Sequence, residues 1–218
     1  MLSSGLFFKA DSGIKTPADL KGKTLGVGPK LDAQAYLASL LAAGGLTKAD
    51  VKIVDPGYSH VPMLLAGKID AAHGLTYTEG MAADEELAKE GKPPVGWFLY
   101  KDFGVPAFYY QVLAVNADWA KSHPNTVCRF LRASLKGLDT WLTSPDAALA
   151  AIVKADDAFT PAQHKAIFEY SKSHWKSGDV VFAQDATVWT QARDWALQQK
   201  LISVGDDVSN YFTNAYLP

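Results

Sequence analysis

The 218-residue sequence contains a single cysteine, Cys128, and no long hydrophobic run. One thiol cannot form a disulfide within the chain, and its apolar neighbours in TVCRFL favour a buried structural residue. No apolar run approaches the roughly 18 residues that a bilayer-spanning helix needs. The opening MLSSGLFFKADSGIK lacks a basic region, a long apolar stretch and a small-residue cleavage site. We therefore do not expect a signal peptide within this chain.

The sequence also lacks an excess of charge of either sign. The 21 Lys and Arg nearly balance the 23 Asp and Glu, which gives a net charge of -2. Nucleic-acid surfaces need clustered basic residues, so we expect no nucleic-acid partner. The chain is 48% hydrophobic, enough to bury a core in one large domain or in two small lobes.

The common motifs of catalysis are absent as well. The five histidines form no HExxH pair, and no Cys–His set with zinc spacing is present. The sequence has no G-x-S-x-G elbow and no P-loop, and GVGPKLDA lacks the third glycine of G-x-G-x-x-G. His73 with Glu79 could act as an acid–base or metal pair, although a solvated or core histidine is the favoured interpretation. We expect no metal, no cofactor and no enzymatic activity.

Strand and helix patterns alternate in the first half of the chain. Short β-rich runs end in glycine or turn residues, and amphipathic stretches follow them; Asp32 is placed as the N-cap of one helix, and Gly44 or Gly45 as its terminator. This alternation predicts a parallel, doubly wound sheet. The expected strands are residues 5–10, 23–28, 51–57 and 69–76, and the expected helices are residues 32–45 and 60–68, with a helical turn at 15–22.

The second half is predicted to be mostly helical. A polar helix at 81–92 and two aromatic-rich strands at 95–100 and 109–117 precede it. Because only helices follow the strand at 109–117, its edges need partners from a sheet that the later sequence does not supply. Helices are expected at 125–143, 144–157, 160–176 and 185–202, a last short helix in 207–218, and core positions at Trp97, Trp119, Trp141, Trp189 and Trp195.

Four stretches in this order carry a family resemblance: DSGIKTPADLKGKTLGV, LLAGKIDAAHG, the long run from YQVLAVNADWAKSHP to DAALAAI, and WALQQKLI. Together they resemble the SsuA-like and NMT1/THI5-like substrate-binding proteins of ABC importers. The resemblance implies an α/β fold of the periplasmic binding protein type II kind. Two lobes with doubly wound sheets would be joined by a two-strand hinge.

The resemblance also implies a division of the chain. Residues 1–14 would be a hinge-crossing strand and a remnant of lobe 1, residues 15–105 would be lobe 2, and residues 106–218 would be the return crossing strand and the C-terminal helices of lobe 1. Family members begin with roughly a lobe's worth of β-α-β before DSGIKTPADL. We therefore expect the first lobe to be incomplete, and a homodimer is one way for another chain to complete it.

The implied function is capture of a small molecule outside the cytoplasm for delivery to an ABC permease. We expect a thiamine-precursor-like pyrimidine as the ligand. One alternative is a sulfonate- or nitrate-type oxyanion. The other is a pyrimidine synthase-like enzyme on the same fold, which the lone Cys128 disfavours because those synthases use a cysteine-rich segment.

The first candidate site is the turn after the strand at 23–28. In open α/β sheets, ligands bind at the carboxyl ends of strands. Gly28 allows close backbone approach, but Pro29 removes one donor and Asp32 competes for N–H groups that an anion would need. Lys30 could restore attraction for an anion, and Leu31 suggests contact with a flat, partly apolar ligand. A plain crossover turn remains the alternative.

The second candidate is HGLTYTEG, where Thr76, Tyr77 and Glu79 follow a strand end. A tyrosine ring can stack on a heterocycle, and a carboxylate accepts paired N–H donors from an aminopyrimidine-like edge. An acidic residue here is typical of the thiamine-precursor branch of the family that the chain resembles. The alternative role for Glu79 is to cap the helix that follows. Tyr109 in the return strand and Tyr58 after VKIVDPG complete the candidate ligand-binding set.

Overall fold

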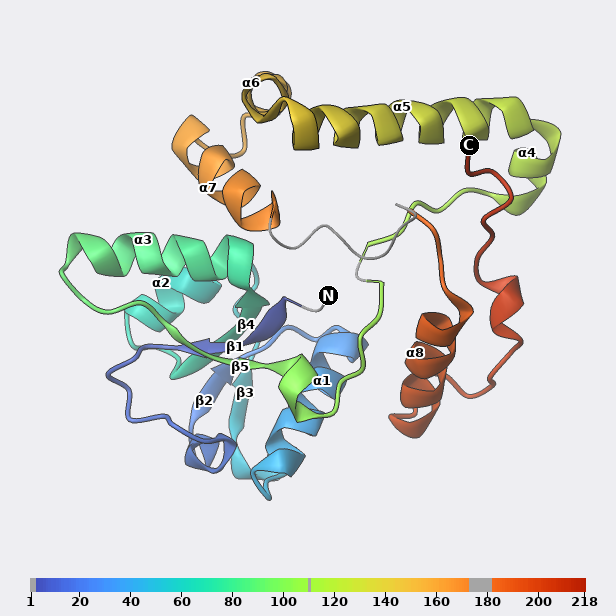
Figure 1. Cartoon of the computed structure of the whole chain (residues 1–218). Helices are drawn as coiled ribbons and strands as arrows, with labels where there is room; N and C mark the ends of the chain where they lie inside the picture. The colour runs from blue at the N-terminus through green and yellow to red at the C-terminus, as the bar shows by residue number, and fades with distance from the viewer. Residues whose placement is uncertain (1–2, 110, 173–181) are drawn as a thin grey trace. The chain divides into compact units, whose positions relative to one another are not determined.

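The chain forms two compact units, which are described separately. Unit 1 comprises Met1–Phe108 and Thr190–Gly205, and unit 2 comprises Tyr109–Trp189 and Asp206–Pro218. The computed structural model in Figure 1 describes residues 3–109, 111–172 and 182–218.

A five-stranded mixed sheet forms the centre of unit 1. Its strand order is β3-β2-β4-β1-β5, with β2 parallel to both β3 and β4, and β1 antiparallel to β4 and β5. The prediction of parallel β-α-β units is confirmed for β2, β3 and β4, while the antiparallel β1 makes the whole sheet mixed. The strands are β1 Ser4–Phe8, β2 Thr24–Gly26, β3 Lys52–Val54, β4 Ala71–Leu75 and β5 Gly96–Leu99.

The first strand is an inner strand of this sheet. Its five residues are all buried, and it lies between β4 and β5. We expected this segment within the crossing region 1–14; its pairing ties it to the sheet of unit 1, and the division into two lobes stays a prediction. Because Ser4 lies opposite Leu75, the start of β1 meets the carboxyl end of β4 at one edge of the sheet.

Helices cover both faces of the sheet. The α-helices of unit 1 are α1 Leu31–Ala43, α2 His60–Leu65 and α3 Met81–Lys89, with short helical turns η1 Pro17–Leu20, η2 Lys48–Asp50, η3 Thr76–Gly80 and η4 Tyr100–Phe103. Side chains alternate along β1, so Leu6 and Phe8 pack on the α1 side while Phe7 packs on the side of α2 and α3.

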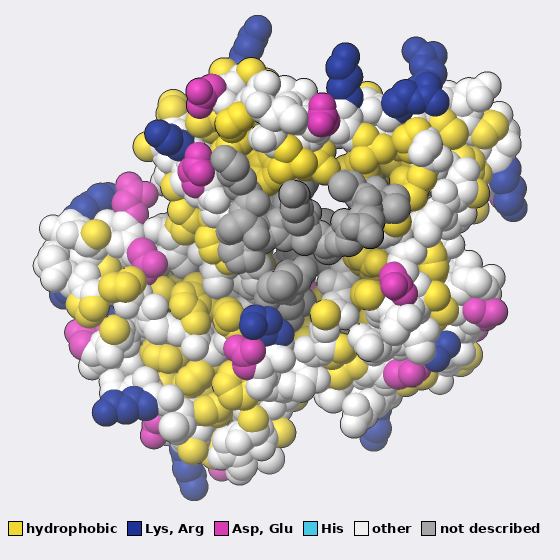
Figure 2. Space-filling model, in the orientation of Figure 1, with side chains coloured by type: hydrophobic (Ala, Val, Ile, Leu, Met, Phe, Trp, Pro, Cys, Tyr) yellow, Lys and Arg dark blue, Asp and Glu magenta, His cyan; other side chains and the backbone are white. Residues whose placement is uncertain are grey.

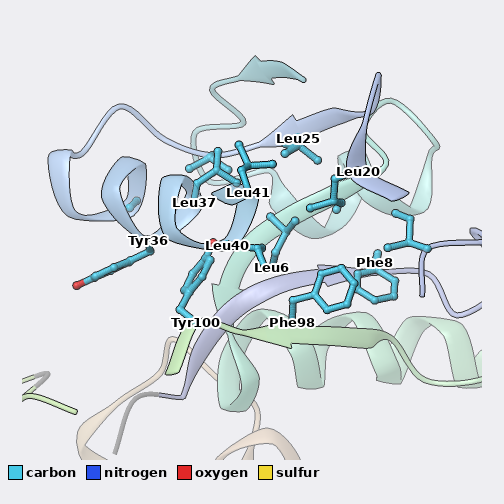
Figure 3. Packing of buried hydrophobic residues seen from close by; sticks show 14 of the residues in the cluster. Leu6, Phe8, Leu20, Leu25, Tyr36, Leu37, Leu40, Leu41, Phe98 and Tyr100 are labelled. Atoms are coloured by element: carbon cyan, nitrogen blue, oxygen red, sulfur yellow. The ribbon is translucent and has the colours of Figure 1, made fainter. Parts of the chain in front are cut away.

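The larger core cluster lies between α1 and the sheet. Figure 3 shows Leu37, Leu40 and Leu41 of α1 beside Leu6 and Leu25, and all five are fully buried. Burying each leucine contributes about 1.5–3 kcal/mol. At one end of the cluster the rings of Tyr36 and Tyr100 lie together, and at the other end Phe8 contacts Phe98.

The start of α1 differs from the expectation. The helix begins at Leu31, with Lys30 in the N-cap position, so the prediction of Asp32 as N-cap is wrong. Asp32 instead lies within the first turn, where its Oδ1 accepts a hydrogen bond from the N–H of Ala33. The helix ends at Ala43 with Gly44 as its C-cap, which agrees with the prediction of Gly44 or Gly45 as terminator.

Unit 2 is built from helices. Leu138 and Trp141 of α5 pack with Ala148 of α6 and Phe168 of α7 in a small core. The predicted helices are confirmed, except that residues 173–176 of the expected third helix lie outside the described residues. The bounds are α4 Ala117–Ser122, α5 Pro124–Thr143, α6 Pro145–Ala155 and α7 Pro161–Lys172, with the short turn η5 Val208–Asn210. The helix α8 Ala186–Gln198 begins in unit 2, and its residues from Thr190 onward belong to unit 1.

The strand expected at 109–117 is absent from the described residues of that stretch; Tyr110 lies outside them. Val112, Leu113 and Val115 are instead 47%, 59% and 49% exposed. The prediction fails because none of the strands in the described chain pairs with this segment. Trp119 is likewise 43% exposed, so its expected core position is wrong.

The helix α5 is strongly amphipathic. Phe130 and Leu142 are exposed large hydrophobic residues on it, while its other face carries basic side chains. In Figure 2 the basic side chains project from one side of the α5 region and hydrophobic side chains line the opposite side. Among the described residues, no helix is both long and apolar enough to cross a membrane.

Candidate active edge of the sheet in unit 1

The candidate site is the edge of the unit 1 sheet where β2, β3 and β4 end. The turns at this edge are Gly28–Lys30 after β2, the loop from Asp55 to Ser59 after β3, and η3 after β4. These are the carboxyl ends of neighbouring parallel strands, where α/β folds bind ligands. Two of the predicted segments, 28–32 and 76–79, are therefore parts of the same edge.

The turn into α1 uses some of its polar groups in internal hydrogen bonds. Pro29 has no N–H, and the N–H of Ala33 donates to Asp32. The side-chain Nε2 of Gln34 donates to the carbonyl oxygen of Gly28 at 2.9 Å. Lys30 and Asp32 are both exposed, whereas the side chain of Leu31 lies outside the described part of the chain. The N–H of Ala33 and the side chain of Gln34 are therefore not free to bind an anion.

The loop after β3 carries a second carboxylate. Asp55 Oδ1 accepts a hydrogen bond from the N–H of Gly57, and it lies 3.8 Å from where a Cβ on Gly28 would be. This places the β2 and β3 loops side by side. Tyr58 follows and is fully exposed, so its ring is available for contact with another molecule.

The turn after β4 is organised by Glu79. A π-helical turn spans Thr76–Gly80 and leads directly into α3. Glu79 Oε2 accepts hydrogen bonds from the N–H of Leu75 at 2.9 Å and from the Thr78 hydroxyl. Burial alone would raise the Glu79 pKa, but these hydrogen bonds outweigh burial and hold the pKa below its usual value. The carboxylate is therefore ionised, fixed in place and half-buried.

Two histidines interact electrostatically with this carboxylate. Burial lowers the pKa of His60, and the charges of Glu79 and Asp55 only partly oppose that effect. Burial also lowers the pKa of His73 to about 4, with His60 acting in the same direction and Glu79 and Asp32 opposing it. Both rings are consequently neutral at pH 7.

His73 is held by an aromatic partner. Its Nδ1 lies 3.1 Å from the hydroxyl of Tyr100, and the two rings stack with centroids 5.6 Å apart. Tyr100 is completely buried, and it also contacts the ring of Tyr36. Of the two ring nitrogens of His73, only Nδ1 has a partner among the described residues.

The side chains at this edge of the sheet are mostly hydrogen-bond acceptors. Asp32, Asp55 and Glu79 carry negative charge, Lys30 carries the positive charge, and His60 and His73 are neutral. Two backbone donors after β4 are already used, because the N–H of Leu75 bonds Glu79 and the N–H of Thr76 bonds the carbonyl of Ser3. Such an edge suits a neutral or cationic molecule that donates hydrogen bonds.

Tyr109 stands apart from this set because it belongs to unit 2. Its hydroxyl accepts a hydrogen bond from the N–H of Asp185 at 2.7 Å, and its ring contacts Trp189. Thr76, Tyr77 and Tyr58 belong to the edge itself. Within the described residues no group of three or more His, Cys, Asp and Glu side chains is arranged to hold a metal ion.

Sequence reasoning missed four members of the edge: Asp55, His60, Tyr100 and, as a hydrogen-bonding group, His73. The signal for Asp55 was present, because it follows the strand in KIVDPG directly. Tyr100 had no such signal, since its contact with His73 joins residues 27 positions apart.

A comparison with known protein families identifies the family of this chain. A family model described as NMT1/THI5 like matches residues 2–148. The chain belongs to the NMT1/THI5-like family. This confirms the family resemblance expected from the sequence.

The relatives that are similar in sequence to this NMT1/THI5-like chain include two binding proteins and an enzyme. It is 28% identical to the riboflavin-binding protein RibY of Chloroflexus aurantiacus, over 97% of this chain and 61% of that protein. It is 24% identical to a formylaminopyrimidine-binding protein of Halalkalibacterium halodurans, over 91% of this chain and 62% of that protein. It is 23% identical to a 4-amino-5-hydroxymethyl-2-methylpyrimidine phosphate synthase of Uromyces fabae, over 98% of this chain and 63% of that protein.

Solved structures confirm the expected fold class. The periplasmic aliphatic sulphonate binding protein SsuA of Escherichia coli superposes with a TM-score of 0.66 at 16% identity. The match covers 97% of this chain and 65% of that structure. The α/β fold of the type II binding-protein kind is therefore shown. The chain spans less than two thirds of the length of these relatives.

Proposed function

We propose that the chain is the solute-binding component of an ABC importer and captures a small, neutral heteroaromatic ligand of the thiamine-precursor pyrimidine kind. Lobe closure over the ligand would shift an open–closed equilibrium without making or breaking a bond. Relatives named for riboflavin and for a formylaminopyrimidine support a nitrogen heterocycle.

The observation that carries the proposal is the anchored carboxylate of Glu79. Its Oε2 is held by Leu75 and Thr78, so the group needs no reorganisation when a ligand arrives. A fixed, ionised carboxylate accepts two N–H donors from an amino heterocycle. The neighbouring Asp55 and neutral His60 add acceptors rather than positive charge.

A thermal-shift screen tests this proposal, because a ligand that binds only the folded state raises the melting temperature. The probes are a formylaminopyrimidine, riboflavin and an alkanesulfonate. We expect the heterocycles, and not the sulfonate, to stabilise the protein. Glu79→Gln keeps the shape of the side chain, removes its charge and should weaken heterocycle binding about tenfold, as loss of one charge-assisted hydrogen bond implies.

Glu90→Gln is the matched control, since Glu90 is an exposed carboxylate paired with Lys92 just after α3. It should leave binding unchanged. Stabilisation by the sulfonate together with unchanged heterocycle affinity in Glu79→Gln would contradict the proposal.

The oxyanion alternative rests on Lys30 and on the start of α1. It is disfavoured because Asp32 lies in the same turn, and because Ala33 already uses its N–H to bond Asp32. An anion would also meet the charges of Asp55 and Glu79.

The enzymatic alternative is supported by the synthase-named relatives. Those names concern proteins of which this chain spans about two thirds or less. Turnover of a pyridoxal-type substrate in the presence of iron would replace the binding proposal by this alternative. The proposal of a pure binding protein predicts no product in that assay.

An extracytoplasmic location and an ABC permease as partner follow from the same proposal. For the lobes, unit 1 would correspond to lobe 2, and the helices of unit 2 to the C-terminal part of lobe 1. The exposed Val112, Leu113 and Val115 give unit 2 an apolar surface that a second copy of the chain could cover. If a second copy supplies that cover, the chain will sediment as a dimer; a monomer would exclude the homodimer.

A further inference from the structure

The pair formed by His73 and Tyr100 has a role in ligand recognition that the proposed function does not use. His73 lies in β4, two residues before the strand ends, and Tyr100 begins η4 directly after β5. The two side chains meet by a hydrogen bond of 3.1 Å and by ring stacking at an interplanar angle of 21°. The contact fixes both the place and the orientation of the imidazole.

The protonation of this pair follows from the burial of Tyr100. A phenol hydroxyl is at once a donor and an acceptor, and Tyr100 is 0% exposed. In the described chain, His73 Nδ1 is its hydrogen-bond partner. If Nδ1 carried the proton, the phenol proton would be buried without an acceptor, which is the unfavourable arrangement. The phenol therefore donates to Nδ1, and the proton of the neutral imidazole resides on Nε2.

The nitrogen that remains is free to meet a ligand. Ser4 Oγ and Trp195 Nε1 are the buried side-chain atoms without a partner among the described residues, and His73 Nε2 is not one of them. Since Nε2 also has no protein partner there, it reaches solvent. Burial keeps the ring neutral, with a pKa of about 4, although Glu79 and Asp32 oppose that effect.

We infer that His73 is a specificity-determining residue whose Nε2–H donates a hydrogen bond to a carbonyl of the ligand, and that Tyr100 is the positioning residue that sets its tautomer. The carboxylates of Asp32, Asp55 and Glu79 are acceptors, whereas the Nε2–H of His73 supplies a neutral donor. The donor at His73 recognises a C=O of the ligand, such as that of a formyl group. The inference rests on the proposed function, because it assigns a role within the same site.

The tautomer is tested in the ligand-free protein. The ¹⁵N shifts and couplings of the imidazoles distinguish a protonated Nε2 from a protonated Nδ1, and His73→Gln identifies which of the five signals belongs to His73. We expect His73 to be in the Nε2–H form at pH 7. Tyr100→Phe should convert it to a mixture of tautomers, whereas Tyr36→Phe, which removes a hydroxyl from the same aromatic stack, should leave the signal unchanged. A proton on Nδ1 in the wild-type protein would overturn the inference.

The donor role is tested with two probes, a formylaminopyrimidine and the same aminopyrimidine without the formyl group. We expect the wild-type protein to bind the carbonyl-bearing probe about tenfold more tightly than the probe without the carbonyl. Tyr100→Phe should weaken binding of the carbonyl-bearing probe more than binding of the other probe. Equal affinity of the wild-type protein for both probes would overturn the donor role. If neither probe binds, the proposed function and the donor role both fail, while the spectrum still decides the tautomer.

Discussion

Acidification should destabilise the protein through His73. The unfolded chain titrates this histidine near its usual pKa of 6.5, whereas burial in the folded state lowers the pKa to about 4. Between these values the unfolded state binds a proton that the folded state does not bind. The stability supplied by the neutral His73 is therefore complete above pH 6.5 and is lost progressively as the pH falls toward 4.

The size of this effect follows from the two pKa values. Linkage for a single group with these values lowers the free energy of unfolding by about 2 kcal/mol between pH 7 and pH 5. Lys30, Asp32, His60 and Glu79 are the charged and titratable groups that act on the ring. They are all retained in His73→Gln, so a comparison of the two proteins isolates the contribution of His73.

The assay is urea unfolding of the wild-type protein and of His73→Gln at pH 7, 6 and 5. We expect the wild-type protein to lose about 2 kcal/mol more than the variant between pH 7 and pH 5. Tyr100→Phe, with the hydrogen bond removed and the ring retained, should keep most of the pH dependence because burial is its main cause. Equal losses in the wild-type protein and in His73→Gln would refute the assignment of a buried neutral histidine.

Two glycines give a matched pair of stability predictions. At Gly44, after α1, an added Cβ would lie 2.6 Å from the carbonyl carbon of Pro17, so Gly44→Ala should lower the free energy of unfolding by about 1–3 kcal/mol in urea denaturation. Unchanged stability would show that this contact between α1 and η1 is not tight. At Gly137, within α5, an added Cβ meets no atom within 4 Å, so Gly137→Ala should raise the melting temperature through a helix-propensity gain of up to about 1 kcal/mol. A lower melting temperature at this position would contradict the exposed helix.

Much of the fold could be predicted from local patterns. Runs such as KTLGVG and IDAAHGLT end at Gly28 and Thr76, near the observed ends of β2 and β4. The helices of unit 2 carry Pro145 and Pro161 at their first residues, where proline favours a helix start. Such signals act over a few residues, so they can be recognised without knowing the fold.

The strand at 109–117 shows the limit of these patterns. Its apolar and β-branched composition is typical of a buried strand, but a strand is stable only when a neighbour pairs with its edges. The described chain offers no such neighbour, and Val112, Leu113 and Val115 remain exposed. Asp32 is a smaller example of the same limit. It is a residue type that favours the N-cap position, but it lies in the first turn because the helix begins at Leu31.

By itself, the sequence determined most of the order of helices and strands, the family, and the strand ends that carry Gly28 and Glu79, because those depend on local pattern and on contiguous motifs. The tertiary structure decided which groups share the site. Asp55, His60 and Tyr100 join Glu79 and His73 only because parallel strands bring their carboxyl ends to one edge. The protonation states at that edge also depend on burial and on hydrogen bonds such as the one from Tyr100, neither of which is written in the neighbouring residues.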